Sequence, residues 1–406
     1  MVKSLTNKSI DVNSIGSILL ILLGFSLPLS VAVNNILAII LTLLWVYNKN
    51  YVKSWEYIKN SKFLIALLVF YFLHILGLLW TEDMKWGMYV TKKESLLLFI
   101  PIFMTFIKKD HIKYYISSFL LAITLSEFLS YMVWFEIIPP ILKASVYNPT
   151  IFMHHTSYNP FLAFAVYITG YMILFSKDIT KLQKVLFILF FITMSVNMFI
   201  TGGRAGQVGY LIMLIVLLFQ YFNKNIIKSI LSSIIILSTI LFGAYTVSNI
   251  FHDRVNLAVS EVVNFDSNKN VNTSVGLRIN FAINSLEIIK NNPLVGVGTG
   301  DFKNSYEKIN AIRTPNAIST VQPHNMYILV TTQLGIIGLA SLVMMLFYQI
   351  LFAKNSKNEL ISKLGFALPI LFALIMLSDS YLFGHSTTML FIYFSSILYR
   401  PHDETN

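Results

Sequence analysis

Residues 184–222 decide the class of fold, and they read KVLFILFFITMSVNMFITGGRAGQVGYLIMLIVLLFQYF. Two apolar runs, at 184–200 and 205–222, are separated by a turn of a few residues that contains Arg204. Each run has about the 17 to 25 residues that an α-helix needs to cross a bilayer. The stretch therefore predicts two membrane-spanning helices joined by a very short turn.

The composition of the whole chain agrees with this prediction. Of its 406 residues 56% are hydrophobic and 12% charged, and the mean hydropathy is +0.68, which is too apolar for a soluble protein of this length. The net charge of +11 would suit nucleic acid only if basic residues gathered on a soluble surface, but they lie mostly in short loops, so nucleic acid is not an expected partner. The absence of cysteine excludes disulfides and thiolate metal sites.

Similar apolar runs continue on both sides of 184–222. Together with the first two they lie at about 14–31, 33–47, 63–80, 92–107, 114–138, 160–176, 184–200, 205–222, 226–250, 326–352, 360–380 and 386–399, which makes about twelve expected spans. Because the first run is followed by many others rather than by a soluble domain, a cleaved signal peptide is not expected.

The basic residues orient these spans, because cytoplasmic connections carry an excess of Lys and Arg. With the N-terminus inside, every even-numbered connection is basic, so both ends of the chain are expected in the cytoplasm. The chain then divides into 1–250 with spans 1–9, an outer loop at 251–325, and 326–406 with spans 10–12 and a short cytoplasmic tail. The expected fold is an all-α polytopic membrane protein with about 12 transmembrane helices.

The outer loop at 251–325 is far longer than an ordinary connection, and such loops are usually functional or disordered. Its composition favours order. Apolar residues recur at roughly helical spacing at Leu277, Phe281, Ile283, Leu286, Ile288 and Ile289, before Asn291, Asn292 and Pro293 break the pattern. The loop is therefore expected to be partly helical, with one helix lying at the outer face.

Arg204 is the first residue that points to chemistry. The glycines beside it, Gly202, Gly203 and Gly206, let backbone N–H groups come close to a ligand, while a guanidinium group forks onto phosphate oxygens. The alternative is an arginine that reaches only to lipid headgroups. An ionisable residue between two spans favours the functional interpretation.

A second arginine, Arg278, lies on the helix expected in the outer loop, where it is either functional or a solvated surface residue. It is followed by NPLVGVGTGDF at 292–302, in which Gly296, Gly298 and Gly300 alternate after a helix-ending proline. Such a turn passes close to a ligand or to another backbone. Its spacing is not that of a dinucleotide fingerprint.

His324 follows Pro323 at the outer end of the span at 326–352. With an unperturbed pKa of about 6.5, a histidine there is able to take a proton from a hydroxyl near neutral pH, although a lone histidine at a helix end is more often structural.

Weaker candidates lie at the other outer connections. His154 and His155 are candidates for binding substrate, and Lys92 and Lys93 open a span on the outside, where anchoring is the alternative role. The histidine pair has too few carboxylate neighbours for a metal site. Asp379 and His385 lie near the last outer turn and are candidates for a mutual polar contact.

At these positions the sequence resembles the O-antigen ligase superfamily, the WaaL and Wzy-like enzymes of bacterial envelope glycan assembly. The shared pattern is Gly203-Arg204-Ala205, then Arg278 followed by the motif at 292–302, and then His324-Asn325 leading into QLGIIG at 333–338. It covers about 190–345 closely. The family more often has Ser at position 203 and Trp at position 281, and neither difference removes a charged group.

The resemblance implies a metal-independent, inverting transfer of a glycan, with no cofactor, in a GT-C-like architecture. Arg204 and Arg278 would bind the pyrophosphate of an undecaprenyl-pyrophosphate donor, and His324 would orient or deprotonate the acceptor hydroxyl. The expected substrate-binding residues are Asn325, Gly203, Gly296, Gly298, His154, His155, Lys92 and Lys93. The expected location is the bacterial inner membrane, with the active site facing the periplasm, and the expected partners are donor, acceptor and membrane lipids.

The leading hypothesis is an O-antigen ligase, closest to WaaL, that transfers the glycan to a sugar hydroxyl of the lipid A core. A Wzy-type polymerase of the same superfamily is the nearest alternative, and a protein O-glycosyltransferase is a third. A secondary transporter or flippase, from a different class, would also have many spans. It predicts ionisable residues at mid-membrane, and Glu127 and Glu136 are the few acidic candidates.

Overall fold

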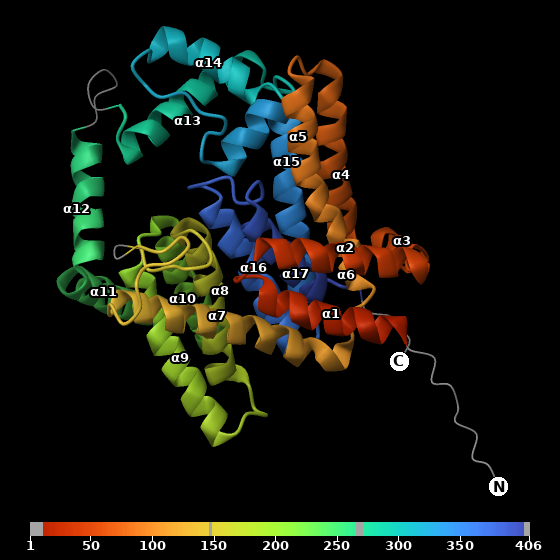
Figure 1. The fold of residues 1–406 in the computed structure, drawn as a ribbon, viewed down its shortest axis with the longest axis vertical. Coiled ribbons are helices and arrows are strands. Elements are labelled where there is room, and N and C mark those ends of the chain that lie inside the picture. The colour runs from red at the N-terminus through yellow and green to blue at the C-terminus, as the bar shows by residue number, and fades with distance from the viewer. Residues whose placement is uncertain (1–10, 146–147, 265–270, 402–406) are drawn as a thin grey trace.

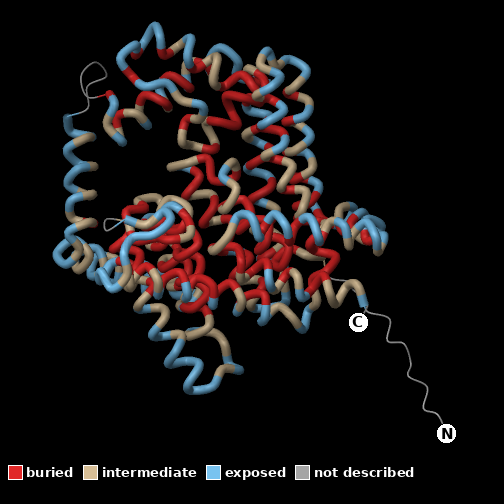
Figure 2. The backbone as a smooth tube through the Cα atoms, in the orientation of Figure 1, coloured by how far each residue is buried: buried red, intermediate tan, exposed pale blue. Residues whose placement is uncertain are grey.

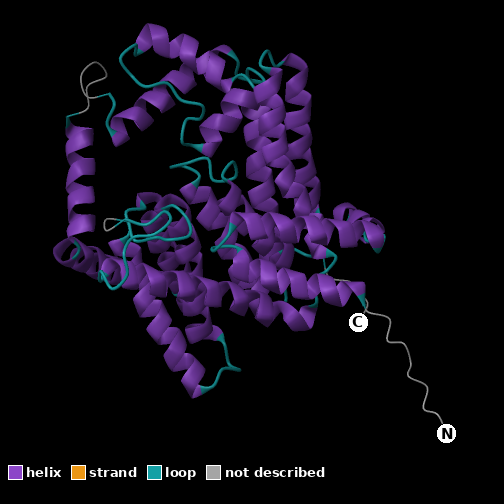
Figure 3. Cartoon of the chain, viewed as in Figure 1, coloured by secondary structure: helices purple, strands orange, loops and turns teal. Residues whose placement is uncertain are grey.

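The computed structural model describes residues 11–145, 148–264 and 271–401, and within these ranges it contains helices and no strand (Figure 3). The α-helices are α1 Val12–Ser26, α2 Val31–Tyr47, α3 Tyr51–Lys59, α4 Lys62–Leu76, α5 Met84–Glu94, α6 Phe99–Met104, α7 Ile112–Trp134, α8 His155–Phe175, α9 Lys181–Ile200, α10 Arg204–Phe222, α11 Ile226–Val247, α12 Asn249–Val263, α13 Ser274–Asn291, α14 Phe302–Arg313, α15 Met326–Asn355, α16 Glu359–Ile375 and α17 His385–Leu398. Short 3-10 turns η1 Gly77–Trp80, η2 Ser95–Leu98 and η3 Lys109–His111 extend or join them. The all-α class is confirmed.

Seven of the helical segments are long and apolar enough to cross a membrane: Lys62–Trp80, Lys109–Trp134 and the helices α8, α9, α10, α11 and α15. Helices α2 and α3 pass the same test together but are bent by 95°. The chain is therefore a polytopic membrane protein. The span count of about twelve stays a prediction, because α1, α2, α16 and α17 have only 14 to 17 residues each.

One expected span differs in the structure. The run at 92–107 is not one helix, because α5 ends at Glu94 and is followed by the 3-10 turn η2 and the short helix α6. Lys92 and Lys93 consequently lie in the last turn of α5 and do not open a helix. The break was not evident from the sequence because the run is largely apolar. Its physical cause is the cluster of charge at 92–94 and the proline at 101, which has no backbone N–H to donate.

The buried core lies where α8, α10, α16 and α17 meet (Figures 1 and 2). Helix α8 is buried along most of its length, and α10 packs against it at Gly206, where an added Cβ would lie 2.2 Å from the Cβ of Asn159. In Figure 1 helices α13 and α14 lie above this core, α12 stands upright at the left, and α4, α5 and α15 stand upright on the other side. The helix expected within the outer loop is α13, which is flanked by α12 and α14.

Helix α15 is kinked at Gly335, whose φ of 65° and ψ of −164° are reserved almost entirely for glycine. The kink leaves backbone groups of α15 without helical partners, and the loop at 293–298 supplies them. Val297 N–H donates to the carbonyl of Thr332 (2.9 Å), Gly298 N–H donates to that of Gln333 (3.0 Å), and Ile336 N–H donates to the carbonyl of Pro293 (2.9 Å). The glycine-rich loop is therefore docked into the kink of a membrane helix.

The same loop is also clamped to the turn between α4 and α5. The carboxylate of Asp301 accepts hydrogen bonds from the backbone N–H groups of Glu82 and Asp83, both at 2.8 Å. Thr299 donates its hydroxyl to the carbonyl of His74 (2.7 Å), and its own carbonyl accepts from the side chain of Gln333 (2.7 Å). These contacts fix the outer loop relative to two membrane helices.

We predict that Gly335→Ala destabilises the protein, because a Cβ would force a glycine-only conformation and would lie 2.1 Å from the carbonyl oxygen of Leu294. The strain alone corresponds to about 1–3 kcal/mol of the free energy of unfolding, which is measured by thermal or chemical unfolding in mild detergent. Gly243→Ala is the matched control, since nothing lies within 4 Å of its added Cβ. Equal stability of the two variants would contradict the docking role of the kink.

Candidate functional site

The turn that carries Arg204 is held rigidly at the start of α10. Asn159 of α8 donates its side-chain N–H to the carbonyl of Gly203 (3.1 Å) and accepts a hydrogen bond from the hydroxyl of Thr201 (2.8 Å). Gly202 N–H donates to the side chain of Asn148 (3.0 Å). An added Cβ at Gly203 would lie 2.6 Å from Nδ2 of Asn159, so this glycine allows the turn to pack on α8, and the backbone holds Arg204 in one place.

The side chain of Arg204 reaches from the membrane bundle to the outer loop. Its Nη2 donates a hydrogen bond to the hydroxyl of Ser274, the first residue of α13 (2.9 Å). Arg278 lies one helical turn further along α13, and residues four apart share one face of a helix. The charge of Arg278 consequently acts on Arg204. The structure thus brings together two arginines that are separated by 74 positions in the sequence.

A third arginine joins this pair and was missed in the sequence. Arg254 of α12 places Nη2 3.6 Å from the position of a Cβ on Gly202, and its charge acts on both Arg204 and His155. No motif marks it, because α12 approaches the turn only in the folded chain. Within the described residues neither Arg254 nor Arg278 makes a hydrogen bond or an ion pair through its guanidinium group, and Glu261 is the acidic residue whose charge acts on Arg204.

His324 is held by an aspartate at the beginning of α15. Its Nδ1 lies 3.1 Å from Oδ1 of Asp379, which follows α16, and its φ of 52° lies in the left-handed region. A carboxylate at Nδ1 keeps the proton on that nitrogen and leaves Nε2 as the basic one. Asp379 therefore pairs with His324 and not with His385, whose Nε2 lies 2.7 Å from the side chain of Asn35.

Arg278 connects the arginines to this histidine–aspartate pair. Phe281, one turn after Arg278 on α13, stacks on the ring of His324 with centroids 5.8 Å apart and planes 24° from parallel. The charge of Arg278 also acts on Tyr381, two residues beyond Asp379. Burial, followed by the charge of Asp379, raises the pKa of Tyr381, so its hydroxyl stays protonated and donates to the carbonyl of Thr156 (3.2 Å). Helix α13 thus links the three residues singled out in the sequence, because it carries Arg278, contacts Arg204 through Ser274 and contacts His324 through Phe281.

The histidine pair borders the same region at the start of α8. The rings of His154 and His155 lie with centroids 3.9 Å apart, and the carbonyl of His155 is 2.8 Å from the position of a Cβ on Gly203. Burial lowers the pKa of His154, and the charge of Lys143 lowers it further, so this ring is neutral near neutral pH. It is thus suited to hydrogen bonding rather than to charge pairing.

Four other candidates are engaged within the protein. Asn325 caps α15 by accepting from Ile328 N–H (3.1 Å) and donates to the carbonyl of Leu377 (2.9 Å). An added Cβ at Gly296 would lie 2.4 Å from the carbonyl of Gln333, and one at Gly298 would lie 2.7 Å from Oγ1 of Thr81. Both glycines allow two backbones to approach. Lys93 reaches the carbonyl of Phe383 (3.5 Å) and lies over the rings of Tyr89 and Phe383, whereas Lys92 is exposed.

Two comparisons with known proteins show what the chain is similar to. Residues 189–343 match the model of the O-Antigen ligase family, a segment that contains Arg204, Arg254, Arg278 and His324. An uncharacterized protein of Haemophilus influenzae is 25% identical over 359 residues, which cover 84% of this chain and 85% of that protein.

We predict that inorganic pyrophosphate stabilises the purified protein, because within the part of the chain that the structure describes Arg204, Arg254 and Arg278 form no ion pair. A ligand at about 100 times its Kd stabilises the folded state by about 2.7 kcal/mol, which is visible as a rise in the unfolding temperature. High salt should weaken the effect. Arg204→Gln, Arg254→Gln and Arg278→Gln should each remove most of it.

Arg313→Gln is the control for this measurement, because Arg313 already pairs with Glu287 at 3.6 Å. A wild-type protein that does not respond to pyrophosphate would refute the anion site, and so would site variants that respond like the control.

Proposed function

We propose that the chain is a bacterial envelope glycosyltransferase, an O-antigen ligase that moves a glycan from undecaprenyl pyrophosphate to a sugar hydroxyl of the lipid A core. One observation carries this proposal: three arginines that form no ion pair within the described residues lie together where the membrane helices meet the outer loop, and a histidine held by an aspartate packs on the same helix, α13. Arg204, Arg254, Arg278 and His324 lie in the segment 189–343 that matches the O-Antigen ligase family, whereas Asp379 lies beyond it. The proposal places the site on the periplasmic face of the inner membrane.

The arginines suit the donor. A lipid-linked diphosphate carries negative charge in its ground state, and more charge builds on the leaving diphosphate as the bond to the sugar breaks. Guanidinium groups held in advance stabilise this charge most in the transition state. Arg204 is fixed by the turn on α8 and by Ser274, while the guanidinium groups of Arg254 and Arg278, which have no hydrogen-bond partner among the described residues, would take phosphate oxygens. The three together match a diphosphate better than a single phosphate.

The histidine–aspartate pair suits the acceptor. In the proposed step, Nε2 of His324 takes the proton of the acceptor hydroxyl, whose oxygen attacks the anomeric carbon of the donor sugar. The bond from that carbon to the diphosphate oxygen breaks, and undecaprenyl pyrophosphate leaves with the electron pair. Attack from the face opposite the leaving group inverts the anomeric centre. Asp379 keeps the proton on Nδ1 and stabilises the imidazolium that forms.

A transporter or flippase remains the alternative from a different class, and buried acids favour it. Glu127 in α7 is buried with neither carboxylate oxygen hydrogen-bonded, and Glu94 is buried with one oxygen unpaired. Ionisable residues inside a membrane often mark transport paths. Purified protein in liposomes separates the two functions, because translocation of lipid-linked glycan without transfer would remove the enzyme hypothesis.

We predict that Arg204→Ala, Arg278→Ala and His324→Ala each abolish transfer, because each removes a group proposed to act on the donor or the acceptor. Arg204→Lys and Arg278→Lys should also be strongly impaired, since a point charge does not reproduce the two-pronged guanidinium fork. The measurement is a gel of surface lipopolysaccharide from a deletion strain that carries each variant, with membrane insertion checked by immunoblot.

The same gel separates the related functions. Loss of the whole ladder together with accumulation of polyprenyl-linked polymer supports a ligase, whereas a single-repeat band supports a polymerase. Full activity of the His324 variant would overturn its assignment as the base.

We predict that Asp379→Asn lowers kcat by about 10²–10⁴-fold and changes KM for the donor little, because the aspartate acts on the base and not on the diphosphate. The measurement is transfer by purified protein from synthetic lipid-linked donor. Asp253→Asn is the matched control, since this carboxylate is exposed and contacts only the exposed His252 (3.2 Å) within the described residues. If both variants instead showed a similar fall in kcat and a similar rise in KM, the cause would be the lost negative charge in general. That result would argue against positioning of His324 by Asp379.

A further inference from the structure

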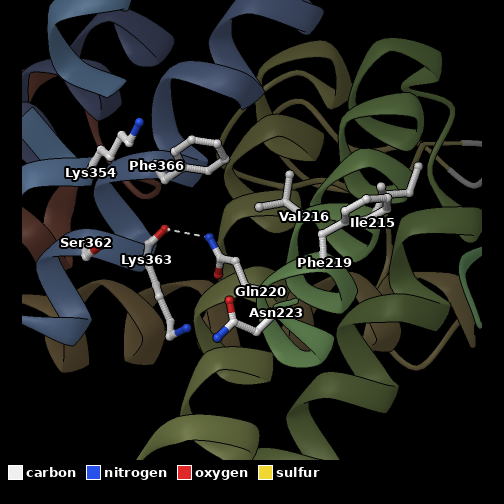
Figure 4. Close-up of a pocket in the computed structure, with 9 residues that line it drawn as sticks. All are labelled: Ile215, Val216, Phe219, Gln220, Asn223, Lys354, Ser362, Lys363 and Phe366. Atoms are coloured by element: carbon white, nitrogen blue, oxygen red, sulfur yellow. Dashed lines mark hydrogen bonds between the residues drawn. The ribbon is translucent and has the colours of Figure 1, made fainter. Parts of the chain in front are cut away.

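Three helices that present residues to the candidate site converge again at their other ends. Helix α10 begins at Arg204, α15 begins two residues after His324, and α16 ends shortly before Asp379. At the far ends of these helices a cavity of about 540 Å³ opens between α10 on one side and α15 and α16 on the other (Figure 4). It is lined by Ile215, Val216, Phe219, Gln220, Asn223, Lys354, Ser362, Lys363 and Phe366.

The length of α10 places this cavity at the opposite interface of the membrane. From Arg204 to Phe222 the helix rises by about 27 Å, at about 1.5 Å per residue. The hydrocarbon core of a bilayer is about 30 Å thick. The cavity therefore lies in the other leaflet from the arginines, on the side where the connections at 223–225 and 356–358 carry further lysines.

One part of the cavity lining is basic and polar. Lys354 makes no hydrogen bond or ion pair within the described ranges, and the side chain of Asn223 makes no hydrogen bond there either. Lys363 lies 3.7 Å from Glu359, which neutralises it in part, and its Nζ lies 4.0 Å from the ring centre of Phe175. Uncompensated positive charge thus remains at the mouth of the cavity.

The other part of the lining is apolar, and hydrogen bonds of Gln220 fix the helices that carry it. Gln220 donates to the carbonyl of Lys363 (3.2 Å), a bond drawn in Figure 4, and accepts from the hydroxyl of Tyr167 (2.6 Å). The bond from Gln220 to Lys363 joins α10 to α16 and fixes the spacing between them. Beside it Phe219 and Phe366 are each 37% exposed, which leaves an apolar surface directly next to the lysines.

We propose that this cavity binds an anionic phospholipid of the inner-facing leaflet. Its phosphate would lie at Lys363 and Asn223, whose side chains point toward one another in Figure 4, while Lys354 on the other side of the lining adds positive charge, and an acyl chain would cover the apolar wall formed by Phe219, Phe366 and Ile215. Basic pockets between membrane helices on the cytoplasmic side recognise anionic headgroups, and the volume lies in the range of ordinary ligand pockets. A free anion would use the lysines but would leave the apolar wall uncovered, which is why the proposal commits to a lipid.

The test is native mass spectrometry of the full-length protein, titrated with dioleoyl phosphatidylglycerol or with zwitterionic dioleoyl phosphatidylcholine. The wild type should bind phosphatidylglycerol at least about tenfold more tightly. The double variant Lys354→Gln/Lys363→Gln should lose most of this preference, whereas Lys354→Arg/Lys363→Arg should keep it because charge is retained. Lys181→Gln/Lys184→Gln is the matched control, since these exposed lysines lie at the start of α9 outside the cavity.

All variants retain the arginines of the candidate site, so any lipid bound there contributes equally to each. Loss of preference in the cavity variant alone supports the site. Equal preference in the cavity variant and the control would overturn it. Displacement of phosphatidylglycerol by inorganic phosphate at a comparable concentration would also overturn it, in favour of a site for free anions.

Discussion

The like charges of Arg254 and Arg278, which both act on Arg204 at the start of α10, are the constraint on which the rest of the site depends. Like charges at contact distance near a protein surface repel by a few kcal/mol, and here Glu261 is the acidic residue whose charge acts on Arg204. A fold keeps such a cluster only if rigid neighbours hold it. The turn at 201–206 is tied to α8 through Asn159, and Arg204 is tied to α13 through Ser274. The fold itself thus holds the turn that carries Arg204 in place.

The docked loop extends this rigidity to His324. Because the segment at 293–298 supplies the backbone partners that the kink at Gly335 leaves unpaired, the loop after α13 is fastened to α15 at residues 332–336. Arg278 and His324 are carried by these two helices, and Phe281 stacks on the histidine ring between them. The glycine-rich motif therefore has a structural role in the site, because it fixes how α13 and α15 lie relative to one another. It sets the distance between charged groups that lie on different helices.

The helices also link the two faces of the membrane. Helices α10, α15 and α16 each have one end at the arginine and histidine cluster and the other end at the basic cavity lined by Lys354 and Lys363. An anionic lipid at the inner end would hold the far ends of the helices that carry the candidate site. Opposite ends of one bundle would thus both recognise phosphate, the outer one for chemistry and the inner one for anchoring.

Hydrophobic patterning by itself determined the all-helical membrane class and the helix within the outer loop, because bilayer thickness and helical periodicity act on local sequence. The residues Arg204, Arg278 and His324 also stood out locally, through their glycine, helix-end and proline neighbours. Only the tertiary structure brought Arg254 to Gly202 and Asp379 to His324, since these contacts join helices far apart in the chain. Only the structure showed that the run at 92–107 is interrupted by a 3-10 turn, and that Gly296 and Gly298 pack against the protein's own backbone. Close packing between elements leaves no periodic pattern in the local sequence.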